Sequence, residues 1–180
     1  MVPNQKRKFN KARSSTPYSM NKVAIISDSH GALDRLGEAL MNLQNGGITE
    51  IIHAGDFALG EIVDLLAKFS NLNFRIARGN CDVDEETLAK IQELPNVKLA
   101  KILEFEIEER KFAVAHRSED LREIENAEIL ISGHTHVPHI EKIHGKLFVN
   151  PGSLMDGGKY ILLDLKNLTI EGKLFNEKIG

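Results

Sequence analysis

The sequence has a single cysteine, no long apolar run and no excess of positive charge, and each absence excludes a class of protein. Cys81 is the only cysteine among 180 residues, so no disulfide can form within the chain, and a reducing compartment is indicated. No run approaches the roughly 20 apolar residues of a membrane-spanning helix. The formal net charge of -3 provides no overall cationic field to hold nucleic acid or an anionic membrane. We therefore expect a soluble, cytoplasmic protein whose affinity for any anion is local.

The composition is otherwise that of an ordinary globular domain, preceded by a basic segment. Hydrophobic residues make up 42% of the chain and charged residues 27%, which suits one domain with a buried core. Residues 1–20 are basic, contain several serines and lack an apolar period, so we predict a disordered tail there. No apolar stretch of signal-peptide length follows it, and Met20, directly before the first apolar run, is a candidate start. The folded domain is then predicted to span residues 21–180.

The first half of the domain alternates short β-branched runs with helical stretches, and the second half is rich in hairpins. Strands are predicted at 23–27, 48–53 and 73–77, and helices at about 33–43 and 62–69. This alternation is typical of βαβ units in a parallel sheet. Residues 97–116 are predicted to form two strands around a turn near 108–110, followed by a short helix at about 120–125. Later tight turns fit His144-Gly145 and Lys166-Asn167. We predict an α/β fold in which two mixed sheets pack face to face with helices outside.

Polar residues follow five of the predicted strands at the point where each strand ends. They are Asp28-Ser29-His30, Gly55-Asp56, Gly79-Asn80-Cys81-Asp82, His116 and Gly133-His134-Thr135-His136. The carboxyl ends of strands in an α/β sheet meet at one crevice, and in extended backbone residues i and i+2 can point the same way toward one ion. A single aspartate here would more often cap a helix, and a single histidine would more often satisfy a core group. The whole set in this order favours a metal site instead.

The strings SDSHG, GD, GNCD, GHTH and NPGS, with a lone histidine after a strand, resemble the calcineurin-like metallophosphoesterases. The resemblance is strongest to the small YfcE-type phosphodiesterase branch and extends from Met20 to about Tyr160. It implies a four-layer αββα sandwich of two mixed β-sheets flanked by helices. It also implies two divalent ions, the first bound by Asp28, His30 and His136, the second by Asn80, His116 and His134, with Asp56 bridging them. Asp56, Asn80 and His116 are the expected catalytic residues.

The donor types decide which ions and which substrate are expected. Carboxylate, amide and imidazole without a thiolate cluster suit Mn, Fe, Ni or Zn, and the resemblance favours Mn. Two such ions leave the site positively charged, so an anionic phosphate ester is the expected substrate, attacked in line by a metal-bridging hydroxide. We predict a phosphodiesterase. The sequence leaves the physiological substrate and the oligomeric state open, a homodimer included.

Two other functions are compatible with parts of the sequence, and a third is disfavoured. A retromer subunit shares the implied fold and works as a non-catalytic scaffold, but its relatives tend to lose a ligand histidine, and this chain keeps all of them. A nucleic-acid-processing phosphoesterase would use the basic tail as an RNA-binding arm, which lacks the interleaved aromatic residues of RNA modules. A hydrolase of the metallo-β-lactamase type is disfavoured because no H-x-H-x-D-H string is present.

Two positions depart from the family pattern and are candidate substrate contacts. Cys81 stands where many larger relatives carry a histidine as general acid, although cysteine is usual in the small branch. Arg117 stands after His116 where Gly-His is usual, and it would either clamp phosphate or be solvated. The stretch from His116 to Gly133 also looks short, which predicts a more open substrate-facing wall.

Two further residues are assigned supporting roles. His53 lies inside a predicted strand and is interpreted as a core residue or as support for the metal ligands. Asp82 with Glu85 fits a capping box for the helix that follows. The Asn150-Pro151-Gly152-Ser153 string is a turn by composition that the resemblance places beside the metal site. Ser153 is not expected to act as a nucleophile.

Overall fold

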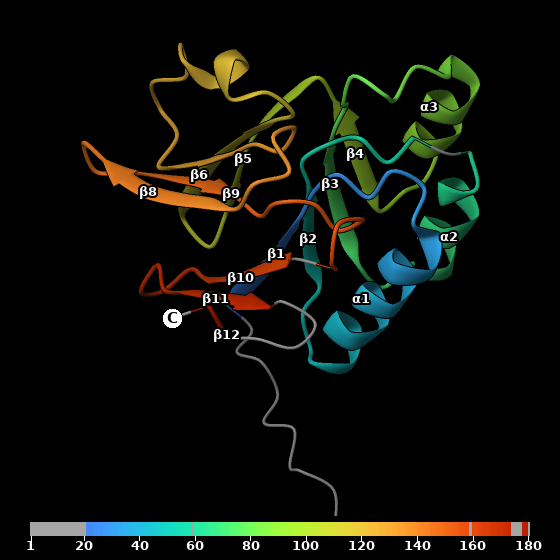
Figure 1. Ribbon diagram of the computed structural model, residues 1–180, viewed down its shortest axis with the longest axis horizontal. Coiled ribbons are helices and arrows are strands. Elements are labelled where there is room, and N and C mark those ends of the chain that lie inside the picture. The colour runs from blue at the N-terminus through green and yellow to red at the C-terminus, as the bar shows by residue number, and fades with distance from the viewer. Residues whose placement is uncertain (1–20, 59, 159, 174–177, 180) are drawn as a thin grey trace, which may run out of the picture.

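A computed structural model describes residues 21–58, 60–158, 160–173 and 178–179. The predicted tail, residues 1–20, lies outside the described residues. In the described part of the chain, twelve strands form two mixed sheets, one of seven strands and one of five (Figure 1). Both the α/β class and the pair of mixed sheets were predicted from the sequence.

The seven-stranded sheet holds the predicted βαβ units. Its strands are β1 (Lys22–Ile26), β2 (Glu50–His53), β3 (Asn73–Ala77), β4 (Val97–Ala100), β10 (Tyr160–Asp164), β11 (Ile170–Lys173) and β12 (Lys178–Ile179). The order is β12-β11-β10-β1-β2-β3-β4, with β1 to β4 parallel and the last three strands of the chain antiparallel. The carboxyl ends of β1, β2 and β3 therefore lie at one edge of this sheet.

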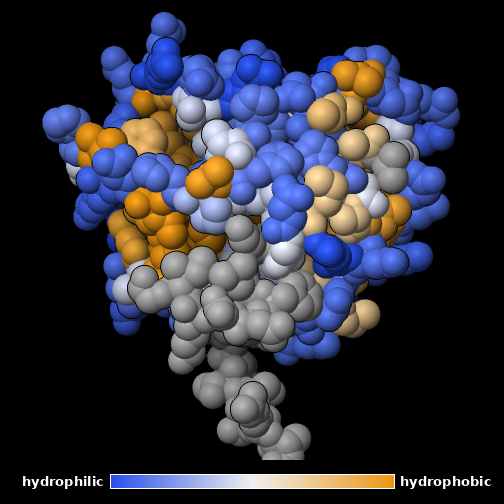
Figure 2. All heavy atoms as spheres, in the orientation of Figure 1, coloured by the Kyte–Doolittle hydropathy of each residue, from blue (hydrophilic) through white to orange (hydrophobic). Residues whose placement is uncertain are grey.

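The five-stranded sheet comes from the hairpin-rich half. It consists of β5 (Ile102–Ile107), β6 (Arg110–Ala115), β7 (Ile129–Ile131), β8 (His139–Ile143) and β9 (Lys146–Asn150). The order is β5-β6-β7-β9-β8, in which β6, β7 and β9 are parallel and the two edge strands are antiparallel to their neighbours. The edge strand β8 is exposed throughout, and hydrophobic patches lie near this edge on a face that is otherwise mostly hydrophilic (Figure 2).

Alternating apolar residues in the strands assign each sheet face to a layer. In β1, Ala24 and Ile26 pack with the helices, whereas Val23 and Ile25 pack with the five-stranded sheet. The helices α1 (Leu33–Asn45), α2 (Ile62–Lys68) and α3 (Glu85–Gln92) cover the outer face of the seven-stranded sheet (Figure 1). The opposite outer face carries a small cluster around Leu121 of the 3-10 helix η1 (Ser118–Leu121). The sandwich is therefore four layers deep, with a thin fourth layer.

Two details of the second half differ from the prediction. Residues 97–115 form three strands. The chain leaves the seven-stranded sheet after β4 and enters the other sheet at β5, with only Lys101 between the two strands. No glycine or proline marks this change of sheet, so it was not visible as a boundary. The helix predicted at about 120–125 is the shorter turn η1. Among the described residues, every helix is too short or too polar to cross a bilayer.

Candidate metal centre

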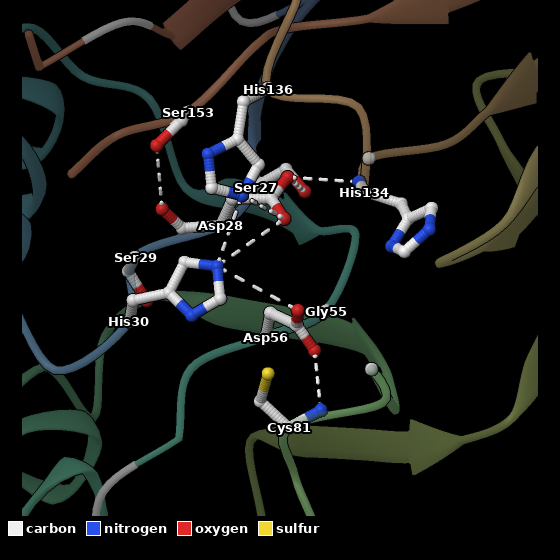
Figure 3. A network of polar contacts seen from close by, with 12 residues as sticks. Ser27, Asp28, Ser29, His30, Gly55, Asp56, Cys81, His134, His136 and Ser153 are labelled. Atoms are coloured by element: carbon white, nitrogen blue, oxygen red, sulfur yellow. Dashed lines mark hydrogen bonds and ion pairs between the residues drawn. The ribbon is translucent and has the colours of Figure 1, made fainter. Parts of the chain in front are cut away.

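The structure places all seven predicted ligands at the ends of strands on one side of the sandwich. Asp28 and His30 follow β1, Asp56 follows β2, Asn80 follows β3, His116 follows β6, and His134 and His136 follow β7. Three strand ends of one sheet therefore face two strand ends of the other. Figure 3 shows the side chains of Asp28, His30, Asp56 and His136 turned toward one another.

Asp28, His30 and His136 form the first cluster. The Nε2 atoms of the two histidines lie 3.1 Å apart, and Oδ1 of Asp28 lies 3.3 Å from Nε2 of His136 and 3.7 Å from Nε2 of His30. Oδ2 of Asp28 accepts hydrogen bonds from the Ser27 hydroxyl, at 2.5 Å, and from the His134 backbone N–H, at 3.1 Å. Oδ1 is buried and has no hydrogen-bond partner. A buried, unpartnered carboxylate oxygen between two imidazole nitrogens fits a divalent cation.

The second cluster is built around His116. Nε2 of His116 lies 3.1 Å from Oδ1 of Asn80 and 3.2 Å from Oδ2 of Asp56, and the His134 ring centroid is 5.0 Å from that of His116. Oδ2 of Asp56 is also 3.7 Å from Nε2 of His30, in the first cluster. Because the backbone N–H of Cys81 donates to Oδ1 of Asp56 at 2.8 Å, Oδ2 is the oxygen left between the clusters. That is the position of a bridging ligand.

Hydrogen bonds to the distal ring nitrogens orient two of the imidazoles. Nδ1 of His116 donates to the Ala54 carbonyl at 2.8 Å, and Nδ1 of His136 donates to Oδ2 of Asp156 at 2.6 Å. Each of these bonds places the Nδ1 proton on an oxygen and points Nε2 at the cluster. The pair of His136 and Asp156 is the carboxylate–histidine arrangement that commonly supports a metal-binding histidine.

The pKa shifts of Asp56 and His116 agree with the contact between them. Burial alone raises the pKa of the Asp56 carboxyl, but hydrogen bonds from His116 and the Cys81 backbone hold this pKa well below its usual range. Burial alone lowers the pKa of the His116 imidazole, and its hydrogen bonds to Asp56 and the Ala54 carbonyl raise it above its ordinary value. Since Nε2 of His116 faces Asp56 and Asn80, an ion bound there would have to displace a proton from this nitrogen.

His53 supports the loops and does not join either cluster. Burial lowers the pKa of its imidazole to about 4, so the ring is neutral at physiological pH. Its Nδ1 accepts from the Gly55 N–H at 3.2 Å, which leaves Nε2 to donate to the Ser29 hydroxyl at 3.0 Å. The ring thus ties the loop after β1 to the loop after β2, in agreement with its predicted supporting role.

Backbone strain is concentrated in the same loops. Five of the seven predicted ligands have positive φ angles: Asp28 at 52°, His30 at 40°, Asp56 at 59°, His134 at 69° and His136 at 60°. Each such non-glycine residue costs about 1–3 kcal/mol, and such residues cluster at functional sites. Close backbone packing accompanies the strain, because a Cβ at Gly133 would lie 1.9 Å from the Ser27 hydroxyl oxygen, and one at Gly79 would lie 2.0 Å from Oδ1 of Asp56.

The donor types in both clusters fit divalent cations. The first cluster offers a carboxylate oxygen and two imidazole nitrogens, the second offers the Asn80 amide oxygen and Nε2 of His116, and Oδ2 of Asp56 reaches toward both. Oxygen and nitrogen donors of this kind suit Mn, Fe, Ni or Zn. Asp28, Asp56 and His116 are buried, so their lone pairs are desolvated unless a cation meets them.

Comparison with known proteins decides the family. Residues 21–168 match the calcineurin-like phosphoesterase superfamily domain. The chain belongs to this superfamily. A probable metallophosphoesterase of Mycoplasma pneumoniae is 33% identical over 150 residues, which cover 75% of this chain and 80% of that protein. A phosphodiesterase of Methanocaldococcus jannaschii is 26% identical over 140 residues, covering 73% of this chain and 82% of that protein.

Solved structures with the same fold are also known. A structure described as a novel archaeal phosphodiesterase superposes with a TM-score of 0.75 at 23% identity, over 85% of this chain and 99% of that one. Yfce, a phosphoesterase from E. coli, has a TM-score of 0.65 at 21% identity, over 86% of this chain and all (100%) of that one. A Vps29 variant from Entamoeba histolytica has the same score and identity, over 88% and 98% of the two chains. At these low sequence identities, the similar structures support the fold and nothing beyond it.

The two predicted substrate contacts are exposed residues, each next to a predicted ligand in the chain. Cys81 is exposed, and its Sγ lies within 4.8 Å of ligand atoms of His30 and Asp56. Arg117 is exposed at the start of η1, and among the described residues no carboxylate pairs with it. Contact of either side chain with substrate stays a prediction.

The NPGS string supports the site as the resemblance implied. The side-chain amide of Asn150 donates to the Gly133 carbonyl at 2.7 Å, and the Ser153 hydroxyl donates to the Asp28 carbonyl at 3.1 Å. Ser153 also accepts from the Asp156 N–H at 3.0 Å. Sequence reasoning missed Asp156, because nothing in its glycine-rich loop separates it from a surface aspartate.

The predicted capping box at Asp82 is wrong. The N-cap of α3 is Asp84, whose carboxylate accepts from the Thr87 N–H at 3.0 Å. Asp82 is instead buried, and its carboxylate accepts backbone hydrogen bonds from the loops after β2 and β3. Asp84 and Thr87 have the spacing of a cap and its N3 partner, so the sequence did contain the signal for the correct cap.

Proposed function

We propose that the chain is a dinuclear metal-dependent phosphodiesterase. The observation that carries this proposal is the position of Oδ2 of Asp56, 3.2 Å from Nε2 of His116 and 3.7 Å from Nε2 of His30. One carboxylate oxygen thus faces imidazoles of both clusters, and the hydrogen bond from Cys81 to Oδ1 keeps it there. Relatives described as phosphodiesterase and probable metallophosphoesterase support the same activity.

Each residue of the centre has a stated part in the proposal. Asp28, His30 and His136 would hold one ion, Asn80, His116 and His134 would hold the other, and Asp56 would lie between them. Two divalent ions, when bound there, supply an activated water and offset the charge of the phosphate. Mn is the ion we expect first, with Ni, Fe or Zn as alternatives.

The orientation of His116 limits what this ring can do. Its Nδ1 proton is held on the buried Ala54 carbonyl, so Nε2 is the nitrogen free to act as a ligand, and with an ion on Nε2 the ring would have no proton to give to a leaving group. Cys81 is the other group close to the clusters with a proton to give, and burial and the neighbouring Asp56 raise the pKa of its thiol. A thiol is a poor general acid near neutral pH. We therefore expect diesters with good leaving groups to be the better substrates.

The two alternative functions have less support than the phosphodiesterase. The non-catalytic scaffold has support from Vps29 neighbours, whose identity of 18–21% carries the fold alone. The nucleic-acid-processing alternative has only the charge of residues 1–20, which lie outside the described residues. The cytoplasmic location, the boundary of the domain at residue 21 and the oligomeric state stay predictions.

Metal content and hydrolysis measured on the same preparation test the proposal. We expect about two Mn ions per chain by mass spectrometry, and metal-dependent hydrolysis of an aryl phosphodiester that exceeds hydrolysis of the matching monoester. Two bound ions without hydrolysis of any ester would favour the scaffold. RNA binding that falls with salt and disappears when residues 1–19 are deleted would favour the nucleic-acid-processing enzyme. A chain that binds no ion would contradict the proposal.

A further inference from the structure

Asp82 is a buried carboxylate whose hydrogen-bond partners belong to two loops of the candidate metal centre. The residue is 2% exposed. Its Oδ2 accepts from the Asp56 N–H at 2.9 Å and from the Gly79 N–H at 2.7 Å, and its Oδ1 accepts from the Ala58 N–H at 2.8 Å. One carboxylate therefore joins the loop after β2 to the loop after β3 through three main-chain donors.

Two of these three donors lie in strained backbone, and the third lies in a tightly packed turn. Asp56 and Ala58 both have positive φ angles, of 59° and 69°, and non-glycine residues keep this conformation only when the surroundings hold it. Gly79, the third donor, packs so closely that a Cβ would lie 2.2 Å from the Asp56 backbone nitrogen. Capture of all three N–H groups by one carboxylate holds the strained turn and the neighbouring loop in a single arrangement.

That arrangement sets the orientation of the Asp56 side chain. The loop after β3 also supplies the Cys81 N–H that donates to Oδ1 of Asp56, so it points Oδ2 at His116 and His30. If the two loops separate, the Cys81 N–H moves away from Oδ1 of Asp56, and the hydrogen bond that orients this carboxylate is lost. The same shift would displace Asn80, which is next to Gly79 in the chain.

We propose that Asp82 is a positioning residue that aims the bridging oxygen of Asp56 and brings Asn80 within reach of the second ion. The proposal rests on the dinuclear centre described above, and Asp82 acts through the backbone without touching an ion. An Asn at this position would offer one oxygen and one NH2 group, so at least one main-chain N–H would face another donor. Residues that orient metal ligands in this way typically contribute 10–100-fold to metal affinity.

The test compares Asp82→Asn with Asp84→Asn, two residues further along and on the surface. Asp84 caps α3, and an asparagine also caps helices, so its variant makes the same chemical change without touching the metal loops. We expect Asp82→Asn to weaken binding of one Mn ion at least about tenfold in calorimetric titrations. It should also replace the exchange-coupled di-Mn electron paramagnetic resonance signal by that of isolated Mn. Asp84→Asn should keep both properties. Retained coupling and affinity within twofold of the parent for Asp82→Asn would overturn the proposal.

Amide hydrogen exchange of the metal-free parent makes the test independent of metal binding and of the folding of any variant. We expect the N–H groups of Asp56, Ala58 and Gly79 to exchange at least about tenfold more slowly than exposed loop amides. Fast exchange at all three would overturn the role of Asp82. If the parent binds fewer than two Mn ions but protects these amides, the dinuclear function fails while the tie between the loops stands.

Discussion

The two sheets contribute different chemistry to the candidate centre. The seven-stranded sheet supplies both carboxylates, the amide and one imidazole, whereas the five-stranded sheet supplies three imidazoles, from His116, His134 and His136. Neither set is complete. The first cluster needs His136 beside Asp28, and the second needs Asp56 and Asn80 beside His116. Each candidate ligand cluster therefore forms only when one sheet packs against the other.

Hydrogen bonds across the sheet interface keep the two sets of donors in register. The His134 N–H donates to the Asp28 carboxylate, and the His116 ring donates to the Ala54 carbonyl after β2. Each bond joins residues more than 60 positions apart, with separations of 106 and 62. The five-stranded sheet is therefore a partner in the orientation of the carboxylates as well as a source of imidazoles.

The largest effect is expected where the two donor sets meet, at Asp56. Asp56→Asn removes the negative charge between His30 and His116, so we expect loss of at least one Mn ion per chain and at least about a 100-fold fall in diester hydrolysis. Metal analysis and initial rates measure both. Asp64→Asn, an exposed change on α2, is the matched control. Full metal occupancy with retained hydrolysis in Asp56→Asn would show that the two sheets do not share an ion-bridging carboxylate.

Gly133→Ala should disturb the contact between the sheets themselves. The new Cβ would lie 1.9 Å from the Ser27 hydroxyl oxygen and 2.7 Å from Oδ2 of Asp28, so we expect a loss of about 1–3 kcal/mol in the free energy of unfolding. Gly37→Ala, within α1 and with its nearest neighbour at 3.4 Å, should gain up to about 1 kcal/mol from helix propensity. Urea unfolding of both variants makes the comparison. Equal stabilities would mean that the sheets approach less closely at Gly133.

Asp156→Ala tests the support of an imidazole from the five-stranded sheet. Without the carboxylate, Nδ1 of His136 loses its acceptor at 2.6 Å, and we expect Mn to bind the first cluster about tenfold more weakly. Calorimetric titration measures this affinity. Asp120→Ala, which removes a surface ion pair with Lys101, should leave it unchanged. If Mn affinity changes equally little in both variants, Asp156 does not support the metal centre.

The pH dependence of stability should contrast a histidine of each sheet. His53, after burial, has a pKa of about 4, so between pH 6.5 and 4 the unfolded metal-free chain binds a proton that the folded chain excludes. The free energy of unfolding should then fall by up to about 1.4 kcal/mol per pH unit as the pH drops. His53→Gln should flatten this slope, whereas His116, whose pKa is raised, contributes stability at low pH that is lost as pH rises. Urea titrations in chelator at several pH values test this. Parallel curves for parent and His53→Gln would contradict it.

The smallest effect is expected at Cys81. If the ions stabilise the leaving oxygen, Cys81→Ala should keep aryl diester hydrolysis within about threefold, since a thiol adds little as a general acid. Rates against the pKa of the leaving group provide the measurement in parent and variant, and Cys81→His is predicted to extend activity to alkyl esters. A shallow dependence in the parent that becomes steep in Cys81→Ala would show that the thiol donates the proton.

The sequence by itself determined the fold class and the place of the candidate ligands at strand ends. Asp28, Asp56 and Asn80 directly follow apolar β-branched runs, and parallel strands place their carboxyl ends at one edge, so short-range pattern was sufficient. The approximate positions of the hairpins and helices were predicted from the same periodicity. The change of sheet between β4 and β5 was not.

Tertiary structure alone decided how those side chains are held. The spacing of Asp84 and Thr87 marks the cap of α3, but nothing in the sequence shows that Asp82 is buried against Asp56, 26 positions away. The role of Asp156 and the choice of Oδ1 as the unpartnered oxygen of Asp28 likewise depend on contacts between distant segments. Local propensity cannot encode such contacts, because burial and hydrogen-bond partners exist only once the two sheets have packed.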